Sequence, residues 1–310
     1  MRIVFFGNGE FGVPILRMLA EHHDVPAVMT NPDRLSGRGR KTHPTPVKKS
    51  ANENDIPVIE AEKLRDPDLH NRLKDLDADL FFVVAYRILP PEIFTMPSLG
   101  TVNLHTSLLP DYRGAAPINW AIINGDTETG MTTFFIDENV DTGAMIMTER
   151  IAIDPDETAG ELSARMSETG AGLSLRTVDA IERGEAVTMP QPDIQARPAP
   201  KLSKEDGIID WHGSAQDIHN LVRGLDPWPG AYTTDTRGML KIHRSALTHG
   251  EAGHEPGTVI NADRANGLVV SCGEGALRLV EVQPEGKKAM DGASYVNGYR
   301  VKAGNRLGER

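Results

Sequence analysis

An asparagine and a histidine, Asn103 and His105, are the side chains of this 310-residue chain whose types and spacing best suit chemistry. Both lie in the apolar stretch from Thr101 to His105, which we predict to be a β-strand. Side chains two positions apart on a strand project from the same face, so this amide and this imidazole would converge on one point. The amide can donate a hydrogen bond and the imidazole can carry a proton, so together they could stabilise negative charge on a carbonyl oxygen.

Two aspartates could supply a carboxylate to that histidine. Asp137 and Asp141 lie in a stretch that ends at Gly143 and follows another predicted strand, and either could orient or charge the imidazole of His105. The same stretch could instead form only a turn, because Asp-Thr-Gly is favoured in turns. An aspartic protease also carries Asp-Thr-Gly, but it needs two such carboxylates facing each other. A single copy in an α/β context excludes that class.

A glycine-rich turn follows the first predicted strand, from Gly7 to Gly12. Its GxGxxG spacing, with Asp33 about 20 residues further on, is that of a dinucleotide-binding turn. Asp33 follows Asn31-Pro32, however, where it can cap its own backbone. These residues therefore leave two alternatives, an NAD-dependent oxidoreductase and a structural strand-to-helix turn.

A basic segment extends from Arg34 to Lys49 and holds six positive side chains and no acidic one. In a chain of net charge −11, this concentration favours contact with phosphate groups, and Gly37 and Gly39 predict a flexible loop. Contacts of this kind position a nucleic acid without reading its sequence. A solvated loop, a site for a small phosphate and a non-catalytic RNA-binding module are the alternatives.

The elements that would position these residues alternate between short apolar runs and helical periodicity. We predict strands at Ile3 to Phe6, Val25 to Thr30, Pro57 to Ile59, Leu80 to Ala85, Thr101 to His105, Met131 to Ile136 and Met145 to Ile153. A helix is predicted from Thr158 to Ile181, interrupted at Gly170 and Gly172. The pattern predicts a doubly wound α/β domain with a mostly parallel sheet. Asn103 and His105 then lie near the carboxyl end of a strand, where such sheets bind ligands.

A proline-rich stretch separates this half from the next. Four prolines between Pro190 and Pro200 predict a stiff, extended linker, because proline neither continues a helix nor donates to a sheet. Beyond it we predict a helix from Ala215 to Arg223 and then short strands that form a small, OB-like β-barrel of about 100 residues. Those strands are Leu240 to His243, Gly257 to Ile260, Leu268 to Ser271 and Leu277 to Val282. The expected domains are residues 1–189, a linker at 190–205, and 206–310.

Composition excludes several classes of protein. With 39% hydrophobic and 25% charged residues, the chain is neither disordered nor collagenous. Its one cysteine, Cys272, cannot form an internal disulfide, and the Cys and His spacings of a zinc site are absent, so we expect no metal and a reducing cytoplasm. No stretch approaches about 18 consecutive apolar residues, so we expect neither a membrane span nor a secretory signal.

Taken together, these residues resemble the methionyl-tRNA formyltransferase family over nearly the whole chain. The formyl-transfer core is matched by Asn103 to His105, Ser107 to Pro110, Tyr112 to Ile118 and Asp141 to Gly143. Amino-sugar and glycinamide ribonucleotide formyltransferases share the Asn, His and Asp of this core. The tRNA branch is favoured by the basic segment and by Lys201 to Trp211, Asp226 to Gly230 and Gly286 to Met290.

The resemblance implies a Rossmann-like enzyme that transfers the formyl group of 10-formyltetrahydrofolate to the α-amino group of methionyl initiator tRNA. It implies that the catalytic residues are Asn103, His105 and Asp141. It further implies folate binding by Tyr86, Ser107, Leu108, Leu109 and Pro110, and tRNA binding by Arg38, Arg40, Lys41, Lys287 and Lys288. We expect a cytoplasmic monomer with no metal and no membrane partner. An amino-sugar nucleotide N-formyltransferase with the same folate donor is the alternative.

The chain departs from the family pattern at two places. The family commonly has a proline where Gly9 stands, so the GxGxxG spacing is accidental and the NAD alternative is disfavoured. The stretch from Val84 to Pro90 is one residue shorter than the usual form, in which a glycine follows the tyrosine. Because this loop lines the folate pocket in relatives, we expect its pterin contacts to differ.

Overall fold

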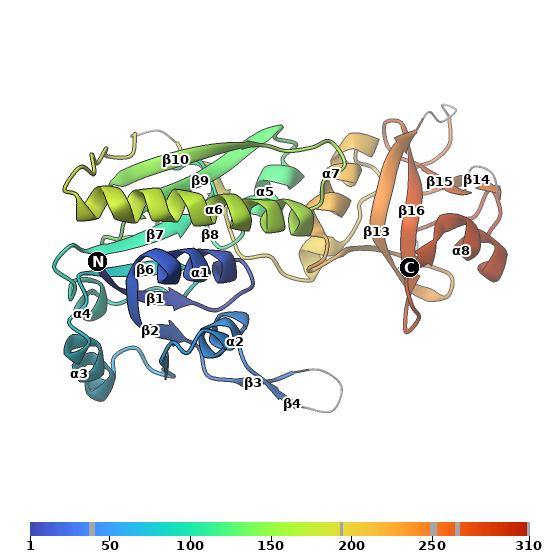
Figure 1. Ribbon diagram of the computed structural model, residues 1–310. Helices are drawn as coiled ribbons and strands as arrows, with labels where there is room; N and C mark the ends of the chain where they lie inside the picture. The colour runs from blue at the N-terminus through green and yellow to red at the C-terminus, as the bar shows by residue number, and fades with distance from the viewer. Residues whose placement is uncertain (37–40, 193–194, 249–252, 264–266, 309–310) are drawn as a thin grey trace. The chain divides into compact units, whose positions relative to one another are not determined.

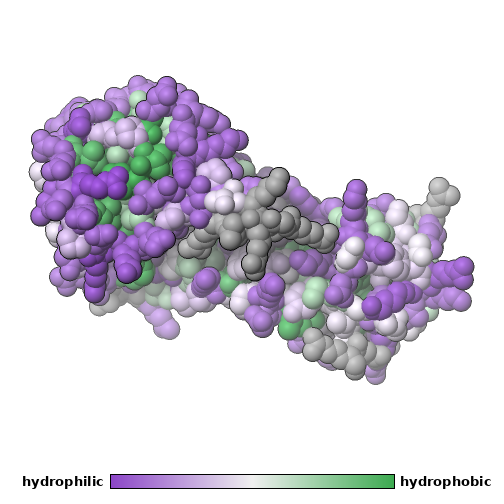
Figure 2. All heavy atoms as spheres, turned by 90° about the horizontal axis from the view of Figure 1, so that it is seen from below, coloured by the Kyte–Doolittle hydropathy of each residue, from purple (hydrophilic) through white to green (hydrophobic). Residues whose placement is uncertain are grey.

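The computed structural model describes residues 1–36, 41–192, 195–248, 253–263 and 267–308 (Figure 1). The chain forms two compact units, each assembled from separate stretches of sequence. The first unit comprises Met1–Gly114, Thr129–Ile151 and Ser163–Pro198. The second unit comprises Ala115–Glu128, Ala152–Leu162 and Ala199–Arg310. The face shown in Figure 2 is covered mainly by hydrophilic residues, as expected for a chain of which 25% is charged.

The first unit is built on a seven-stranded sheet in the order β10-β9-β7-β6-β1-β2-β5. The strands are β1 (Arg2–Gly7), β2 (Asp24–Thr30), β5 (Val58–Glu60), β6 (Leu80–Val84), β7 (Thr101–His105), β9 (Glu128–Phe135) and β10 (Met145–Ala152). Neighbouring strands from β5 to β7 run parallel, and β9 is antiparallel to β7. The predicted doubly wound, mostly parallel sheet is therefore confirmed.

The order of this sheet determines where a ligand can bind. The chain adds β2 and β5 on one side of β1 and then crosses to β6 and β7 on the other side, which makes β1 and β6 a topological switch point. Every residue of β6 is buried, as expected of a central strand covered on both faces. The carboxyl ends of β1, β6 and β7 consequently form one edge of the sheet.

Helices cover the faces of this sheet. They are α1 (Gly12–His22), α2 (Pro46–Glu53), α3 (Pro67–Asp75), α4 (Pro91–Phe94) and α6 (Ala159–Glu182). Figure 1 shows α1 and α6 lying along the same face. Ser167 of α6 donates a hydrogen bond from Oγ to the carbonyl of Phe11, just before α1, at 2.7 Å.

The predicted interruption of the long helix is wrong, because α6 runs unbroken through both glycines. A Cβ at Gly170 would lie 3.1 Å from Sδ of Met131 and 3.2 Å from Cδ2 of Leu104, so this glycine lets the helix approach the sheet closely. Glycine in a helix costs about 0.5–1 kcal/mol relative to alanine. Tertiary packing at Gly170 offsets that cost and keeps the helix continuous.

The described parts of the basic segment form regular elements, whereas Gly37 and Gly39, where we predict a flexible loop, lie outside the described ranges. Arg34–Ser36 (β3) pairs antiparallel with Lys41–His43 (β4) to form a hairpin, and α2 begins at Pro46. Lys48 of α2 lies 2.7 Å from Asp33 and 2.9 Å from Glu60, and its hydrogen bonds to these two carboxylates raise its pKa. Lys48 is therefore neutralised within the unit. Of the predicted tRNA contacts, Lys41 lies on β4, whereas residues 38 and 40 lie outside the described ranges.

The second unit contains an antiparallel sheet in the order β12-β13-β16-β15-β14, with β17 paired to β16. The strands are β12 (Ala231–Asp235), β13 (Gly238–Thr248), β14 (Val259–Asp263), β15 (Gly267–Ser271), β16 (Ala276–Pro284) and β17 (Met290–Asp291). The segment 305–308 connects the two end strands: Val259 N donates to Asn305 O, and Gly308 N donates to Thr234 O, both at 2.8 Å. These bonds close the sheet into the small barrel that the sequence predicts.

The remaining elements are short helices and strands, most of them in the second unit. They are α5 (Pro117–Ile123), α7 (Ala215–Leu225), α8 (Gly292–Tyr299), the 3₁₀ turn η1 (Glu205–Gly207) and the two-residue strands β8 (Arg113–Gly114) and β11 (Pro198–Ala199). Helix α5 packs against α7, where Asn119 Nδ2 donates to Gly224 O at 2.7 Å. Burial raises the pKa of the Cys272 thiol to about 12, so this free cysteine is unreactive at neutral pH. None of the described helices could cross a membrane.

Replacing Gly170 with leucine should lower the free energy of unfolding by about 1–3 kcal/mol, because the side chain would displace Met131 and Leu104. Gly172→Leu is the matched control, since a Cβ there would meet nothing nearer than Nη1 of Arg176 at 3.6 Å. Urea denaturation followed by circular dichroism measures both changes. Equal losses at the two positions would contradict the packing explanation.

Candidate active site

The two polar side chains singled out on β7 differ in their surroundings. His105 ends the strand and is 7% exposed, and Asn103 is half-buried. Within the described parts of the chain, the amide of Asn103 has no hydrogen-bond partner. Both side chains project from the same face of β7, at the edge formed by the carboxyl ends of the strands. Asn103 can therefore donate to a bound ligand without breaking an existing bond.

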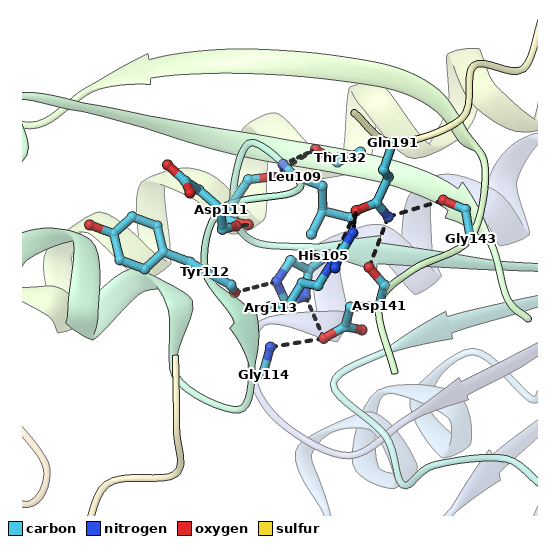
Figure 3. A network of polar contacts seen from close by, with 11 residues as sticks. His105, Leu109, Asp111, Tyr112, Arg113, Gly114, Thr132, Asp141, Gly143 and Gln191 are labelled. Atoms are coloured by element: carbon cyan, nitrogen blue, oxygen red, sulfur yellow. Dashed lines mark hydrogen bonds and ion pairs between the residues drawn. The ribbon is translucent and has the colours of Figure 1, made fainter. Parts of the chain in front are cut away.

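Hydrogen bonding fixes which nitrogen of His105 can take part in chemistry. Nε2 lies 2.8 Å from the carbonyl oxygen of Tyr112 (Figure 3). Because a carbonyl oxygen can only accept, Nε2 must carry a proton. Nδ1 instead faces Oδ2 of Asp141 at 3.8 Å, a distance suited to electrostatic pairing but too long for a hydrogen bond. Nδ1 is thus the nitrogen that can gain or lose a proton.

The structure distinguishes the two candidate aspartates. Asp137 accepts from Asn139 N at 3.0 Å and from Thr142 Oγ1 at 2.7 Å, so it stabilises the turn itself. Asp141 is the carboxylate beside His105, and its Oδ2 accepts from Gly114 N at 2.9 Å. The charge-assisted bond from a backbone N–H fixes the orientation of this carboxylate.

The turn that carries Asp141 is unusually constrained. Asp141 adopts a left-handed conformation with φ 57°, which is unfavourable for a residue with a side chain. Gly143 follows closely, and a Cβ there would lie 1.6 Å from the carbonyl oxygen of Phe135. Only glycine fits at that approach. Asp-Thr-Gly therefore forms a turn, and the same turn directs the carboxylate of Asp141 toward His105. The sequence leaves the turn and the carboxylate partner as alternatives, and the structure combines them.

Three consecutive residues hold different parts of the site. Tyr112 accepts from His105, Gly114 donates to Asp141, and Arg113 donates from Nε to Oε1 of Gln191 at 3.0 Å. Gln191 in turn donates from Nε2 to the carbonyls of Asp141 at 2.8 Å and Gly143 at 3.0 Å (Figure 3). In the sequence, Arg113 falls within the formyl-transfer core without a predicted role, and Gln191 falls only within the predicted linker.

The residues expected to bind folate lie beside β6 and β7. Ser107 is fully buried, and its Oγ donates to Asp111 O at 2.5 Å, so it shapes the turn after β7. Leu109 is also buried, and its N–H donates to Thr132 Oγ1 at 3.1 Å. Leu108 is half-buried between them, and Pro110 follows a cis peptide bond.

Arg87 holds the loop after β6. Its Nη2 donates to the Tyr86 hydroxyl at 2.8 Å and to Ala61 O at 2.6 Å, and its Nη1 donates to Glu62 O at 2.9 Å. The ring of Tyr86 packs edge-on against Phe6, and burial raises the pKa of Tyr86. The guanidinium of Arg87 thereby fixes the loop for which we predict altered pterin contacts.

The glycine-rich turn after β1 is occupied by contacts within the protein. Oδ1 of Asn8 accepts from Asn31 N at 2.8 Å and from Thr30 Oγ1 at 3.2 Å. Asp33, the candidate for a ribose hydroxyl, is paired with Lys48 at 2.7 Å. These contacts favour the structural strand-to-helix turn over the NAD-binding alternative.

The two lysines expected to bind tRNA in the second unit are accessible. Lys287 and Lys288 are exposed in the turn between β16 and β17, and Lys287 N donates to Pro284 O at 3.0 Å. Arg306, further along the chain, is paired with Glu255 at 2.8 Å. The second unit therefore presents exposed positive charge at residues 287–288.

Comparison with known proteins identifies the class. The family model described as formyl transferase matches residues 1–178, and the model of the formyl transferase C-terminal domain matches residues 201–300. The solved structure of the N-formyltransferase from Helicobacter canadensis, in complex with folinic acid and dTDP-3-aminofucose, has a TM-score of 0.68 and covers 89% of this chain and 97% of that chain. At 22% identity, that likeness concerns the fold alone. The chain belongs to the formyl transferase family.

Full-length relatives narrow this class. The methionyl-tRNA formyltransferase of Geobacter sulfurreducens is 45% identical over 311 residues, which cover 100% of this chain and 97% of the relative. That of Symbiobacterium thermophilum is 46% identical over 310 residues, which cover 99% of this chain and 95% of the relative. The resemblance found in the sequence to methionyl-tRNA formyltransferases is confirmed.

Proposed function

We propose that the protein transfers the formyl group of 10-formyltetrahydrofolate to the α-amino group of methionyl initiator tRNA, giving N-formylmethionyl-tRNA for translation initiation. The observation that carries the proposal is an Asn103 amide, without a partner among the described residues, beside a histidine whose Nδ1 faces Asp141. The names of the full-length relatives support the acceptor. We expect the enzyme to act as a monomer in the cytoplasm.

The reaction begins with attack by the α-amine on the formyl carbon. As the new C–N bond forms, the electron pair of the C=O bond moves to oxygen and creates a tetrahedral oxyanion. Asn103 donates a hydrogen bond to this oxygen. Because Nε2 of His105 is held by Tyr112 O, only Nδ1 of that ring can serve the reacting groups, with the carboxylate of Asp141 opposite it.

Proton transfer completes the exchange. An α-amino group titrates near ~7.7 to 8.0, so a substantial fraction is neutral at cellular pH and no strong base is needed. His105 and Asp141 assist the loss of the ammonium proton that remains after attack. Collapse of the oxyanion breaks the bond between the formyl carbon and N10 of the folate. N10 takes up a proton, and tetrahydrofolate leaves.

The two substrates would be held by different residues. Tyr86 and the turn from Ser107 to Pro110 lie next to the catalytic edge and would hold the folate. Lys41 of β4, Arg38 and Arg40, which precede it in the sequence, and the exposed Lys287 and Lys288 would contact tRNA phosphates.

The proposal predicts formyl transfer from 10-formyltetrahydrofolate to purified methionyl initiator tRNA. An amino-sugar nucleotide serves as the parallel acceptor, because sugar formyltransferases share the catalytic Asn, His and Asp. We expect formylated product with the tRNA acceptor and none with the amino-sugar nucleotide. Release of tetrahydrofolate and acid-stable formyl label on methionine measure the product. Transfer to the sugar alone would preserve the proposed chemistry but overturn the proposed acceptor.

Asn103→Ala and His105→Ala should each lower kcat about 10² to 10³-fold, because the first removes a hydrogen-bond donor to the oxyanion and the second removes the ring that assists proton loss. Asn139→Ala is a matched control, since Asn139 is exposed and only its backbone takes part in the hydrogen bond to Asp137. Single-turnover kinetics with saturating folate separates this effect from weaker donor binding. Near-normal turnover in either of the first two variants would refute its catalytic role.

Replacing Arg38, Arg40 and Lys41 together with serine should weaken tRNA binding and flatten its dependence on salt. The slope of log K against log salt should fall by about one for each phosphate that the variant no longer neutralises. A triple variant at the exposed Arg65, Arg72 and Lys74 removes the same charge elsewhere in the first unit and should bind nearly normally. Folate affinity, measured by fluorescence titration, should stay unchanged in both. An unchanged salt slope in the first variant would place the tRNA on another surface.

A further inference from the structure

The proline-rich stretch that we predict to be a linker lies against two turns of the first unit, the one at residues 141–143 and the one after β7. We name residues 189–197 the clamp segment, of which 193–194 lie outside the described ranges. At its start, the backbones of Met189 and Met145 exchange two hydrogen bonds of 2.8 and 2.9 Å. At its end, Arg197 Nη2 donates to Asp111 Oδ2 at 2.8 Å, and Arg197 O accepts from Tyr112 N at 2.6 Å. Both ends are thus fixed to strands or turns of the site.

Between these anchors, the half-buried side chain of Gln191 contacts the turn that carries Asp141. One NH₂ group donates to two carbonyls, those of Asp141 at 2.8 Å and Gly143 at 3.0 Å. These carbonyls lie on either side of Thr142, so the amide spans the turn. Both carbonyls thus accept from a side chain and not from the backbone of a neighbouring strand or helix among the described residues. A side chain 50 residues away therefore holds the backbone of residues 141–143, in addition to the bond from Thr142 Oγ1 to Asp137.

Arg113 determines which way the Gln191 amide points. Its guanidinium can only donate, so the group that it meets at 3.0 Å must be the amide oxygen of Gln191. The amide nitrogen is then directed to the two carbonyls, which can only accept. Arg113 also lies between Tyr112, which holds His105, and Gly114, which holds the carboxylate of Asp141. The amide and these backbone groups therefore form one connected hydrogen-bond network (Figure 3).

We propose that Gln191, oriented by Arg113, is a positioning residue for the reaction: its amide holds the left-handed Asp141 turn so that the carboxylate faces Nδ1 of His105. The 3.8 Å between those groups is too long for a hydrogen bond, so the direct contact does not fix their orientation. The tether from Gln191 and the N–H of Gly114 maintain that separation. This inference rests on the proposed function, because the kcat that tests it is that of formyl transfer to tRNA.

Gln191→Ala should lower kcat about 10- to 100-fold, because a displacement of about 1 Å in a reacting group has effects of this size. KM for folate and for tRNA should stay nearly unchanged, since the tether touches neither substrate. Gln195→Ala is the matched control: Gln195 is exposed in the same segment, and its side chain makes no hydrogen bond to the described residues. A normal kcat in Gln191→Ala would overturn the proposal.

Gln191→Glu tests which half of the amide matters. The carboxylate can still accept from Arg113 but cannot donate to the carbonyls of Asp141 and Gly143, so we expect a loss of kcat as large as in Gln191→Ala. Full activity of Gln191→Glu would show that packing or the pair with Arg113 suffices, and it would refute the role of the tether.

Hydrogen exchange of the Gly114 amide tests this inference without any measurement of catalysis. The Gly114 N–H is protected by Asp141 Oδ2 at 2.9 Å, so displacement of the turn should speed its hydrogen exchange in Gln191→Ala and Gln191→Glu, but not in Gln195→Ala. Unchanged exchange in both Gln191 variants would overturn the tether, whatever the substrates are. Faster exchange in those variants, combined with no formyl transfer to tRNA by the wild-type protein, would instead refute the proposed function alone.

Discussion

The hydrogen bond between Nε2 of His105 and the carbonyl of Tyr112 determines how the rest of the site works. It fixes the proton on one nitrogen and directs the other toward Asp141. That carbonyl points at the ring because Tyr112 adopts a left-handed backbone conformation, φ 60°, which a residue with a side chain rarely adopts. The guanidinium of Arg197 stacks on the Tyr112 ring at 4.4 Å and pairs with Asp111, so the surrounding contacts maintain this conformation.

Most of the first unit could be predicted from local patterns. The strands from Ile3 to His105 were predictable because each buried strand is a short apolar run, and a run such as Leu80 to Val84 has no other stable location. The hairpin of β3 and β4 was missed because its strands are three residues long and polar, with no alternation of hydrophobic residues. The continuity of α6 was missed because Gly170 is explained by close packing on β7 and β9, which a single sequence does not reveal.

The catalytic candidates were predictable to a similar extent. The spacing of Asn103 and His105 on one strand requires a common face, and the family resemblance added Asp141. Sequence alone did not decide between Asp137 and Asp141, because both lie in a turn and only the fold directs one of them at the histidine. Gln191 carried no sequence signal beyond an amide among prolines. Proline disfavours the interiors of helices and sheets, yet side chains and carbonyls in an extended segment still form hydrogen bonds.

The interleaving of the two units has a practical consequence for anyone who divides the chain. Residues 115–128 belong to the second unit, and helix α5 within them is joined to α7 by the bond from Asn119 to Gly224. A fragment cut after the clamp segment would carry α5 without α7 and would expose Trp120 and Ile123, which pack against the hydrophobic core of the second unit. A chimaera between two relatives would therefore preserve the interface between α5 and α7 only if both helices come from the same parent.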